Sequence, residues 1–204
     1  MSFYLFPFFI SNQNLKTMTN LKKYLITDPK HYSNNSELFK KNLTRVLKNN
    51  EIDIICFRDK ESENFEELAK IFVEICKDFN VEKILLNSNY ELAKNLGANG
   101  VHLTSNQFEE IKEAKRLGLY VIVSCHTFSE IEKAQNAYAN AVTFSPIFDT
   151  PNKGEPKGIT SLKEAINLYE DIDIIALGGI VKDEQIELIS KTKAYGFASI
   201  RYFI

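Results

Sequence analysis

The stretch "YVIVSCHTFSEIEKAQNAYANAVTF", residues 120–144, contains the unit on which the fold depends. It begins with a β-branched run at 120–124, continues with an amphipathic run at 128–138 and ends with a second apolar run at 141–144. The outer runs have the length and composition of strands, and the middle run has the apolar spacing of a helix. Strands that are joined through a helix run parallel to each other. The stretch therefore predicts a strand–helix–strand unit of a parallel sheet.

The same alternation extends from Tyr24 almost to the end of the chain. Eight short apolar runs have the character of strands, and they occupy residues 24–27, 52–57, 83–87, 100–103, 120–124, 141–144, 173–177 and 194–199. The helix-like runs between them occupy residues 37–49, 64–79, 90–96, 108–117, 128–138, 161–169 and 182–191. Several strands are apolar throughout, as strands buried on both faces are. Eight such units predict an α/β fold, a (β/α)8 TIM barrel. A doubly wound open sheet is the alternative, but it usually has about six strands.

The pattern contains seven helices for eight strands, so the eighth helix is missing. The sequence stops at "SIRYFI" (199–204), directly after the last predicted strand. The outer face between the last and the first strand then needs a cover. Either the aromatic N-terminal segment or a second subunit in a homodimer would provide one. Residues 1–19 are predicted to be an extension that is packed on the barrel or disordered, and residues 20–204 are predicted to form the barrel domain.

Composition and charge narrow the class of protein. The chain has 204 residues, of which 44% are hydrophobic, and this length can bury a substantial core in one domain. A net charge of −2 gives no reason to expect nucleic acid or a membrane surface as a partner. The apolar segment 1–10 is too short to span a bilayer and has no positively charged region before it. Three widely spaced cysteines predict buried free thiols in a reduced, cytoplasmic protein and no metal site.

Positive charges gather where two of the predicted strands end. In a barrel, functional residues lie at the carboxyl ends of the strands. Arg58 and Lys60 follow the second strand, and Lys153 lies in the long loop after the sixth. Guanidinium and ammonium groups on one rim suit phosphate or pyrophosphate, so we predict an anionic subsite here. Solvated rim side chains are the alternative.

A second anionic subsite is predicted after the last two strands. Gly178 and Gly179 end the seventh strand, and Ser199 ends the eighth. Paired glycines let backbone N–H groups approach an anion, and this is the usual phosphate position of the fold. A plain turn is the alternative for the two glycines taken alone.

Two histidines lie near the same rim. His102 falls within an apolar strand and is predicted to line the barrel in preference to acting as a base. His126 follows Ser124 at a strand end. Two interpretations of His126 stay open: it orients a ligand, or it caps the next helix.

Several motifs together resemble the thiamine phosphate synthase/TenI family of (β/α)8 barrels. The matching pieces are "YLIT" (24–27), "FRDK" (57–60), "LLNSNYELAKNLGANGVHL" (85–103), "SCHTFSEIEKA" (124–134), "FSPIFDTPNKGEPKG" (144–158), "ALGGI" (176–180) and "GFASI" (196–200). Their order and spacing match over nearly the whole barrel. The pattern "PIF-x-T-x-x-K" is the most specific of them.

The resemblance implies both a reaction and roles for residues of this chain. In the synthases, hydroxymethylpyrimidine diphosphate loses pyrophosphate, and the nitrogen of a thiazole phosphate captures the resulting cation. The implied catalytic residues, which grip the pyrophosphate, are Arg58, Lys60 and Lys153. The substrate-binding residues are predicted to be Asn87, Ser124, His126, Thr150, Asn152, Gly178, Gly179 and Ser199. The resemblance itself places Asn87 beside the pyrophosphate and Ser124 beside the pyrimidine.

The sequence departs from both branches of the family. The synthases carry magnesium-binding Asp residues where this chain has Ser88 and Gln107, and they carry Gln and Thr where it has Cys56 and Asn152. Because magnesium prefers carboxylate and phosphate oxygens, we predict no metal ligands in this chain, and the sequence gives little support for a Mg²⁺ cofactor. The TenI-type tautomerases also lack these acids, but their active-site His is Pro146 here.

Three functions therefore stay open. The first is a divergent thiamine phosphate synthase-like transferase, which ranks ahead because Arg58, Lys60, Asn87 and Lys153 are all retained. The second is a TenI-like protein that binds or tautomerises a thiazole phosphate. The third is a non-catalytic protein that binds a phosphate ligand or has a regulatory role. All three imply small phosphorylated molecules as partners.

Overall fold

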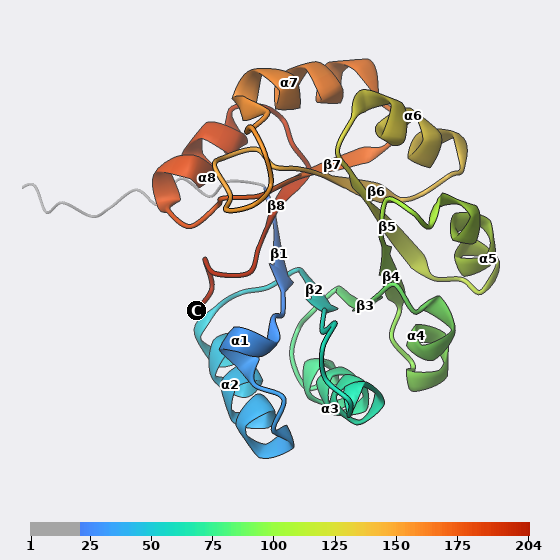
Figure 1. Cartoon of the computed structure of the whole chain (residues 1–204), viewed down its shortest axis with the longest axis vertical. Coiled ribbons are helices and arrows are strands. Elements are labelled where there is room, and N and C mark those ends of the chain that lie inside the picture. Colours follow the sequence, from blue (N-terminus) through green and yellow to red (C-terminus); the bar gives the residue numbers. More distant parts are fainter. Residues whose placement is uncertain (1–20) are drawn as a thin grey trace, which may run out of the picture.

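The fold is a closed parallel barrel surrounded by helices (Figure 1), seen in a computed structural model that describes residues 21–204. The extension predicted for residues 1–19 lies outside the described residues. The strands are β1 (Lys22–Ile26), β2 (Ile54–Phe57), β3 (Lys83–Asn87), β4 (Gly100–Leu103), β5 (Tyr120–Cys125), β6 (Ala141–Phe144), β7 (Asp173–Leu177) and β8 (Gly196–Ser199). The helices are α1 (Pro29–Tyr32), α2 (Ser36–Asn49), α3 (Phe65–Lys77), α4 (Tyr90–Leu96), η1 (Phe108–Glu110), α5 (Ile111–Arg116), α6 (Phe128–Asn136), α7 (Gly158–Leu168) and α8 (Asp183–Ser190). The predicted TIM barrel is confirmed, and the open-sheet alternative is wrong.

The barrel closes because β8 pairs with β1 in parallel. Lys22 lies opposite Gly196, and Leu25 lies opposite Ser199. A Cβ atom at position 196 would collide with the backbone oxygen of Lys22, so the closing strand can approach this closely only with glycine there. Each remaining strand pairs with its sequence neighbours, so all eight carboxyl ends lie on one rim.

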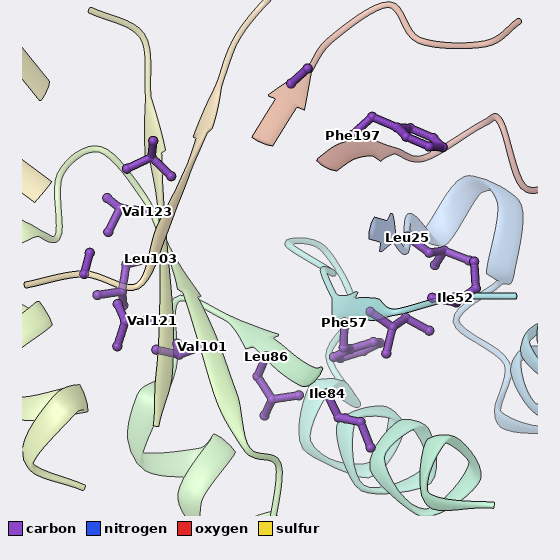
Figure 2. Close-up of a cluster of buried hydrophobic side chains, with 14 of the residues drawn as sticks. Leu25, Ile52, Phe57, Ile84, Leu86, Val101, Leu103, Val121, Val123 and Phe197 are labelled. Carbon is purple, nitrogen blue, oxygen red and sulfur yellow. The ribbon is translucent and has the colours of Figure 1, made fainter. Parts of the chain in front are cut away.

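Alternating side chains along the strands form two separate cores. The inward-facing core fills the barrel, and its members are Tyr24, Ile26, Ile54, Cys56, Leu85, Ile122, Ala141, Ile175 and Ala198. The outward-facing residues pack under the helices, and Figure 2 shows Leu25, Phe57, Leu86, Val123 and Phe197 among them. Both faces of the sheet are therefore buried, which explains why several strands are nearly continuous apolar runs.

Local signals set the helix ends. Asn35 caps α2 by accepting hydrogen bonds from the N–H groups of the first turn, and α4 ends at Gly97 with φ of +75°. The short helix α1 was not predicted. It starts because Asp28 accepts a hydrogen bond from the Lys30 N–H and Pro29 occupies the first helical position.

Residues 200–204 form a turn, and this described end of the chain contains no helix after β8. The tail covers part of the outer face itself: Phe203 stacks on Phe197 at 5.8 Å between ring centroids, and the Asn50 side chain donates to the Phe203 carbonyl at 3.0 Å. Figure 1 shows the tail in the gap between α8 and the α1–α2 pair. Two covers for this outer face were predicted from the sequence. The N-terminal segment lies outside the described residues, and a second subunit stays a prediction.

Cys56, Cys76 and Cys125 are buried free thiols, as predicted. Burial raises the pKa of the Cys56 thiol to about 12, so it stays protonated near neutral pH. None of the helices between residues 21 and 204 is long and apolar enough to cross a membrane.

We predict that the C-terminal tail stabilises the barrel. Phe203 is 4% exposed and Ile204 is 47% exposed, although the two are neighbours. Replacing Phe203 with Ala should lower the free energy of unfolding by about 3 kcal/mol in urea titrations, because it leaves a cavity over β8. The matched control Ile204→Ala should change it by less than about 0.5 kcal/mol. Equal effects of the two substitutions would show that the tail does not cover the barrel.

Candidate functional site

The predicted site residues come from the carboxyl ends of strands that lie side by side around the barrel. Arg58 follows β2, Asn87 ends β3, Ser124 lies near the end of β5, Gly178 follows β7 and Ser199 ends β8. Because the barrel is closed, these strand ends form a single rim. The structure therefore brings the sequence-predicted residues to one face of the molecule.

The three predicted catalytic cations differ in exposure. Arg58 is half-buried, and its backbone N–H donates to the Thr27 hydroxyl at 2.9 Å, which ties the ends of β1 and β2 together. Lys60 and Lys153 are exposed. None of these three cations makes an ion pair with a carboxylate in the described part of the chain. Their charge is therefore available to an anion.

The loop after β6, residues 145–157, is anchored at both of its ends. The Ile147 and Phe148 N–H groups donate to the carbonyls of Leu177 and Gly178 at 2.9 and 3.1 Å. At the other end, the Lys157 N–H donates to the Pro146 carbonyl at 2.8 Å. The loop is thus a lid, fixed at its ends, over the carboxyl end of β7.

Gly178 and Gly179 have positive φ angles of 101° and 69° because the lid lies directly on them. A Cβ atom at Gly178 would lie 2.7 Å from Pro146 Cα and 3.2 Å from the Thr150 hydroxyl. A Cβ atom at Gly179 would collide with the Asp149 carbonyl. The absence of side chains at the two glycines therefore allows the lid to pack directly on them. Thr150 of the lid thereby lies against the end of β7.

Asn152 has φ of +61° at the tip of the lid. Asn tolerates this left-handed conformation, whereas a β-branched Thr strongly disfavours it. The local backbone thus suits Asn at this position, where the resemblance leads one to expect Thr. Lys153 follows directly, and its N–H donates to the Thr150 carbonyl at 3.2 Å.

Unpaired amides lie between β7 and α8, where the second anionic subsite is predicted. Within residues 21–204, the N–H groups of Gly179, Ile180 and Ile200 have no hydrogen-bond acceptor. The Ser199 hydroxyl is occupied: it donates to the Ile180 carbonyl at 2.7 Å and accepts from the Arg201 N–H at 3.2 Å. An anion here would therefore meet backbone N–H groups and no free Ser199 hydroxyl.

A polar chain crosses the barrel interior below the rim. The Tyr24 hydroxyl lies 2.7 Å from His102 Nδ1, and His102 Nε2 lies 3.0 Å from Ser124 Oγ. The Thr143 hydroxyl lies 3.4 Å from the same Nε2 atom. Burial, reinforced by the nearby Arg58 charge, lowers the pKa of His102 to about 3. His102 is thus a neutral barrel-lining residue, as predicted; its partners Tyr24 and Thr143 were missed, although both lie at inward-facing strand positions.

His126 faces the neighbouring strand end. Its Nδ1 atom lies 3.2 Å from both the carbonyl and the hydroxyl of Ser145. The helix that follows is capped by Thr127, which forms a capping box with Glu130. The alternative that the His126 side chain caps this helix is therefore wrong, and its role toward a ligand stays a prediction.

The residues at the family's magnesium positions do not fit a magnesium ion. The Gln107 side chain donates to the Ser88 carbonyl and to the Glu110 carboxylate at 3.0 and 2.9 Å, and the Ser88 hydroxyl accepts from Asn87 at 2.7 Å. Among the described residues, no three His, Cys, Asp or Glu side chains are grouped as metal ligands would be. A hydroxyl and an amide side chain, each engaged in hydrogen bonds, thus stand where a pair of carboxylates would be needed.

A hollow of about 520 Å³ lies far from this rim, at the opposite end of the barrel. The segments 47–53 and 79–82, which precede β2 and β3, line it. The strand ends that carry the predicted site residues do not contribute to it.

Comparisons with known proteins agree with the barrel and with the motifs. A family model described as thiamine monophosphate synthase matches residues 23–203. A protein of Aquifex aeolicus with the provisional name thiamine-phosphate synthase 2 is 33% identical over 187 residues, which cover 89% of this chain and 96% of that protein. The thiamine-phosphate synthase of Nitrosospira multiformis is 32% identical over 144 residues, which cover 67% of this chain and 61% of that enzyme. In fold, the chain resembles a thiamine phosphate pyrophosphorylase from Pyrococcus furiosus with a TM-score of 0.73 at 22% identity, covering 89% and 86% of the two chains.

We predict that Gly179→Ala displaces the lid. Gly154 has a similar φ of +72° but open space around it, so Gly154→Ala is a matched control for the backbone conformation alone. Both substitutions should cost the strain of a left-handed Ala, about 1–2 kcal/mol of unfolding free energy. Gly179→Ala should cost about 2 kcal/mol more, because its methyl group collides with the lid. Denaturant unfolding measures the difference, and equal costs would contradict the packing of lid on glycine.

The lowered pKa of His102 predicts a loss of stability in mild acid. Below about pH 6.5 the unfolded chain protonates this histidine, whereas the folded chain keeps it neutral down to about pH 3. Between pH 7 and 5, the wild type should therefore lose about 2 kcal/mol more unfolding free energy than His102→Gln does. Urea titrations of both proteins at the two pH values test this. Parallel pH dependence of the two proteins would contradict a buried neutral histidine.

Proposed function

Because the chain belongs to the thiamine monophosphate synthase family, we propose that it is a transferase that joins hydroxymethylpyrimidine diphosphate to a thiazole phosphate and releases pyrophosphate. One observation carries this proposal. Three cations that have no carboxylate partner among residues 21–204, Arg58, Lys60 and Lys153, lie on the same rim as the amides after β7 that no acceptor in this range pairs. Two phosphorylated substrates need two anion sites, and this rim supplies donors of both kinds.

The proposed reaction separates charge, and the rim suits that separation. The bond between the pyrimidine methylene carbon and the diphosphate oxygen breaks, and its electron pair leaves with the pyrophosphate. The thiazole nitrogen then donates its lone pair to the methylene cation and forms the new C–N bond. Fixed positive groups lower the barrier because the negative charge of the leaving group grows as the bond breaks. Arg58, Lys60 and Lys153 would hold that leaving group, and Asn87 would bond its oxygens.

The second substrate would bind on the other side of the rim. The N–H groups of Gly179 and Ile180 would hold its phosphate, with Thr150 from the lid beside them. Ser124, on β5 between the strand that carries Asn87 and the lid, would contact the pyrimidine ring. The anchored lid would exclude water that otherwise captures the cation.

A second candidate function rests on the Ser88–Gln107 pair. The Gln107 amide donates to the Ser88 backbone carbonyl at 3.0 Å, and neither side chain is a carboxylate of the kind that magnesium prefers. A protein that binds a thiazole phosphate without transferring a pyrimidine would not need those carboxylates. Such a TenI-like or regulatory protein would use only the amides after β7 and the lid.

The test is a turnover assay with both substrates, with and without Mg²⁺, that measures thiamine phosphate and pyrophosphate. The transferase should form the two products in equal amounts. Lys153→Ala should lower kcat/KM about a hundredfold, the usual effect of losing one donor to the developing charge. The control is Lys163→Ala, which removes an exposed lysine of α7. Absence of turnover together with thermal stabilisation by thiazole phosphate alone would reject the transferase and favour the binding protein.

A further inference from the structure

The polar chain inside the barrel ends at a residue of the proposed site. Tyr24 on β1, His102 on β4 and Ser124 on β5 are joined by contacts of 2.7 and 3.0 Å. Tyr24 and His102 are buried, whereas Ser124 is half-buried at the rim. We propose that His102 is a positioning residue that holds the Ser124 hydroxyl as a hydrogen-bond donor toward the ligand.

The hydroxyl proton of Tyr24 sets the direction of the hydrogen bonds in this chain. The Tyr24 side chain is completely buried, so its hydroxyl has no access to water. Two groups near it can accept its proton, the imidazole Nδ1 of His102 and the thiol of Cys56. A ring nitrogen is a much better acceptor than a thiol sulfur. Tyr24 therefore donates to His102 Nδ1, and this nitrogen must be unprotonated.

The tautomer of His102 follows from that bond. A neutral imidazole carries one proton, and with Nδ1 accepting, the proton resides on Nε2. The neighbouring charged group, Arg58, is positive and disfavours a second proton on the ring. Nε2–H then donates to Ser124 Oγ at 3.0 Å, while Thr143, at 3.4 Å, is the weaker of the two contacts.

The Nε2–H donor of His102 determines how the Ser124 hydroxyl is oriented. A hydroxyl group has one proton to donate, and Ser124 Oγ is already the acceptor for His102. Its own proton is therefore free to point into the site, toward an acceptor atom of the ligand. An aromatic ring nitrogen, such as a pyrimidine offers, is an acceptor of this kind. This ligand part of the inference rests on the proposed function, whereas the order of donors and acceptors does not.

The order of donors is tested by ¹⁵N NMR of the histidine side chains in the ligand-free full chain, with His102→Gln used for assignment. The expected spectrum shows His102 protonated at Nε2 and bare at Nδ1, unchanged between about pH 5 and 8. A proton on Nδ1, or titration of the ring within this range, overturns the inference. This result does not depend on any substrate.

The effect on the ligand is tested by calorimetric titration with hydroxymethylpyrimidine diphosphate. Ser124→Ala should weaken binding about tenfold, the value of one hydrogen bond. The double variant Tyr24→Phe/His102→Leu should weaken it by the same factor, since removing both buried partners leaves neither unpaired. The triple variant Tyr24→Phe/His102→Leu/Ser124→Ala should bind no more weakly than either of the other two. The single and the double variant would each remove the same interaction with the ligand.

Three further outcomes distinguish this inference from its alternatives. Additive losses of about a hundredfold in the triple variant would overturn it, because Ser124 and His102 would then act independently. The affinity for thiazole phosphate should stay unchanged in all three variants, and a parallel loss there would mean that His102 only supports the fold. If the wild type does not bind the pyrimidine diphosphate at all, the proposed function fails together with the ligand part, and the NMR result still decides the order of donors.

Discussion

The pairing of β8 with β1 is the contact on which the rest of the structure depends. It is made at close range, with Gly196 against the backbone of Lys22, and it turns a row of parallel strands into a ring. An open sheet would spread the strand ends along an edge. The ring instead places the cations after β2, the lid after β6 and the amides after β7 around one opening. Residues 200–204 cover part of the outside of the closing strand, because Phe203 stacks on Phe197 of β8 there.

A second contact, between the lid and the glycines after β7, shapes the site within that ring. The positive φ angles of Gly178 and Gly179 and the hydrogen bonds from Ile147 and Phe148 hold the lid in one position. This arrangement accounts for the glycines without a ligand, and in the described part of the chain it leaves the amides of Gly179 and Ile180 unpaired. The same backbone conformation therefore explains the packing of the lid and supports the proposal that an anion binds here.

The sequence predicted the fold well because the fold follows from periodicity. The runs at 83–87, 100–103, 141–144 and 173–177 match their strands, because short continuous apolar runs between helix-like segments define them. It predicted the rim position of Arg58 and Lys153 because strand ends have fixed places in a barrel. It could not predict the bonds of Ser199 to the backbone or the Tyr24–His102–Ser124 chain. Those depend on side-chain directions across the barrel, between strands far apart in sequence.

The central claim is that one rim holds two anion sites, one built of side-chain cations and one of backbone amides. A crystal structure of the full chain with inorganic pyrophosphate and thiazole phosphate tests it most directly. We expect pyrophosphate beside Arg58, Lys60 and Lys153, and the thiazole phosphate on the N–H groups of Gly179 and Ile180 under an unmoved lid. Both ligands bound elsewhere, or a single anion shared by the cations and the amides, would contradict it.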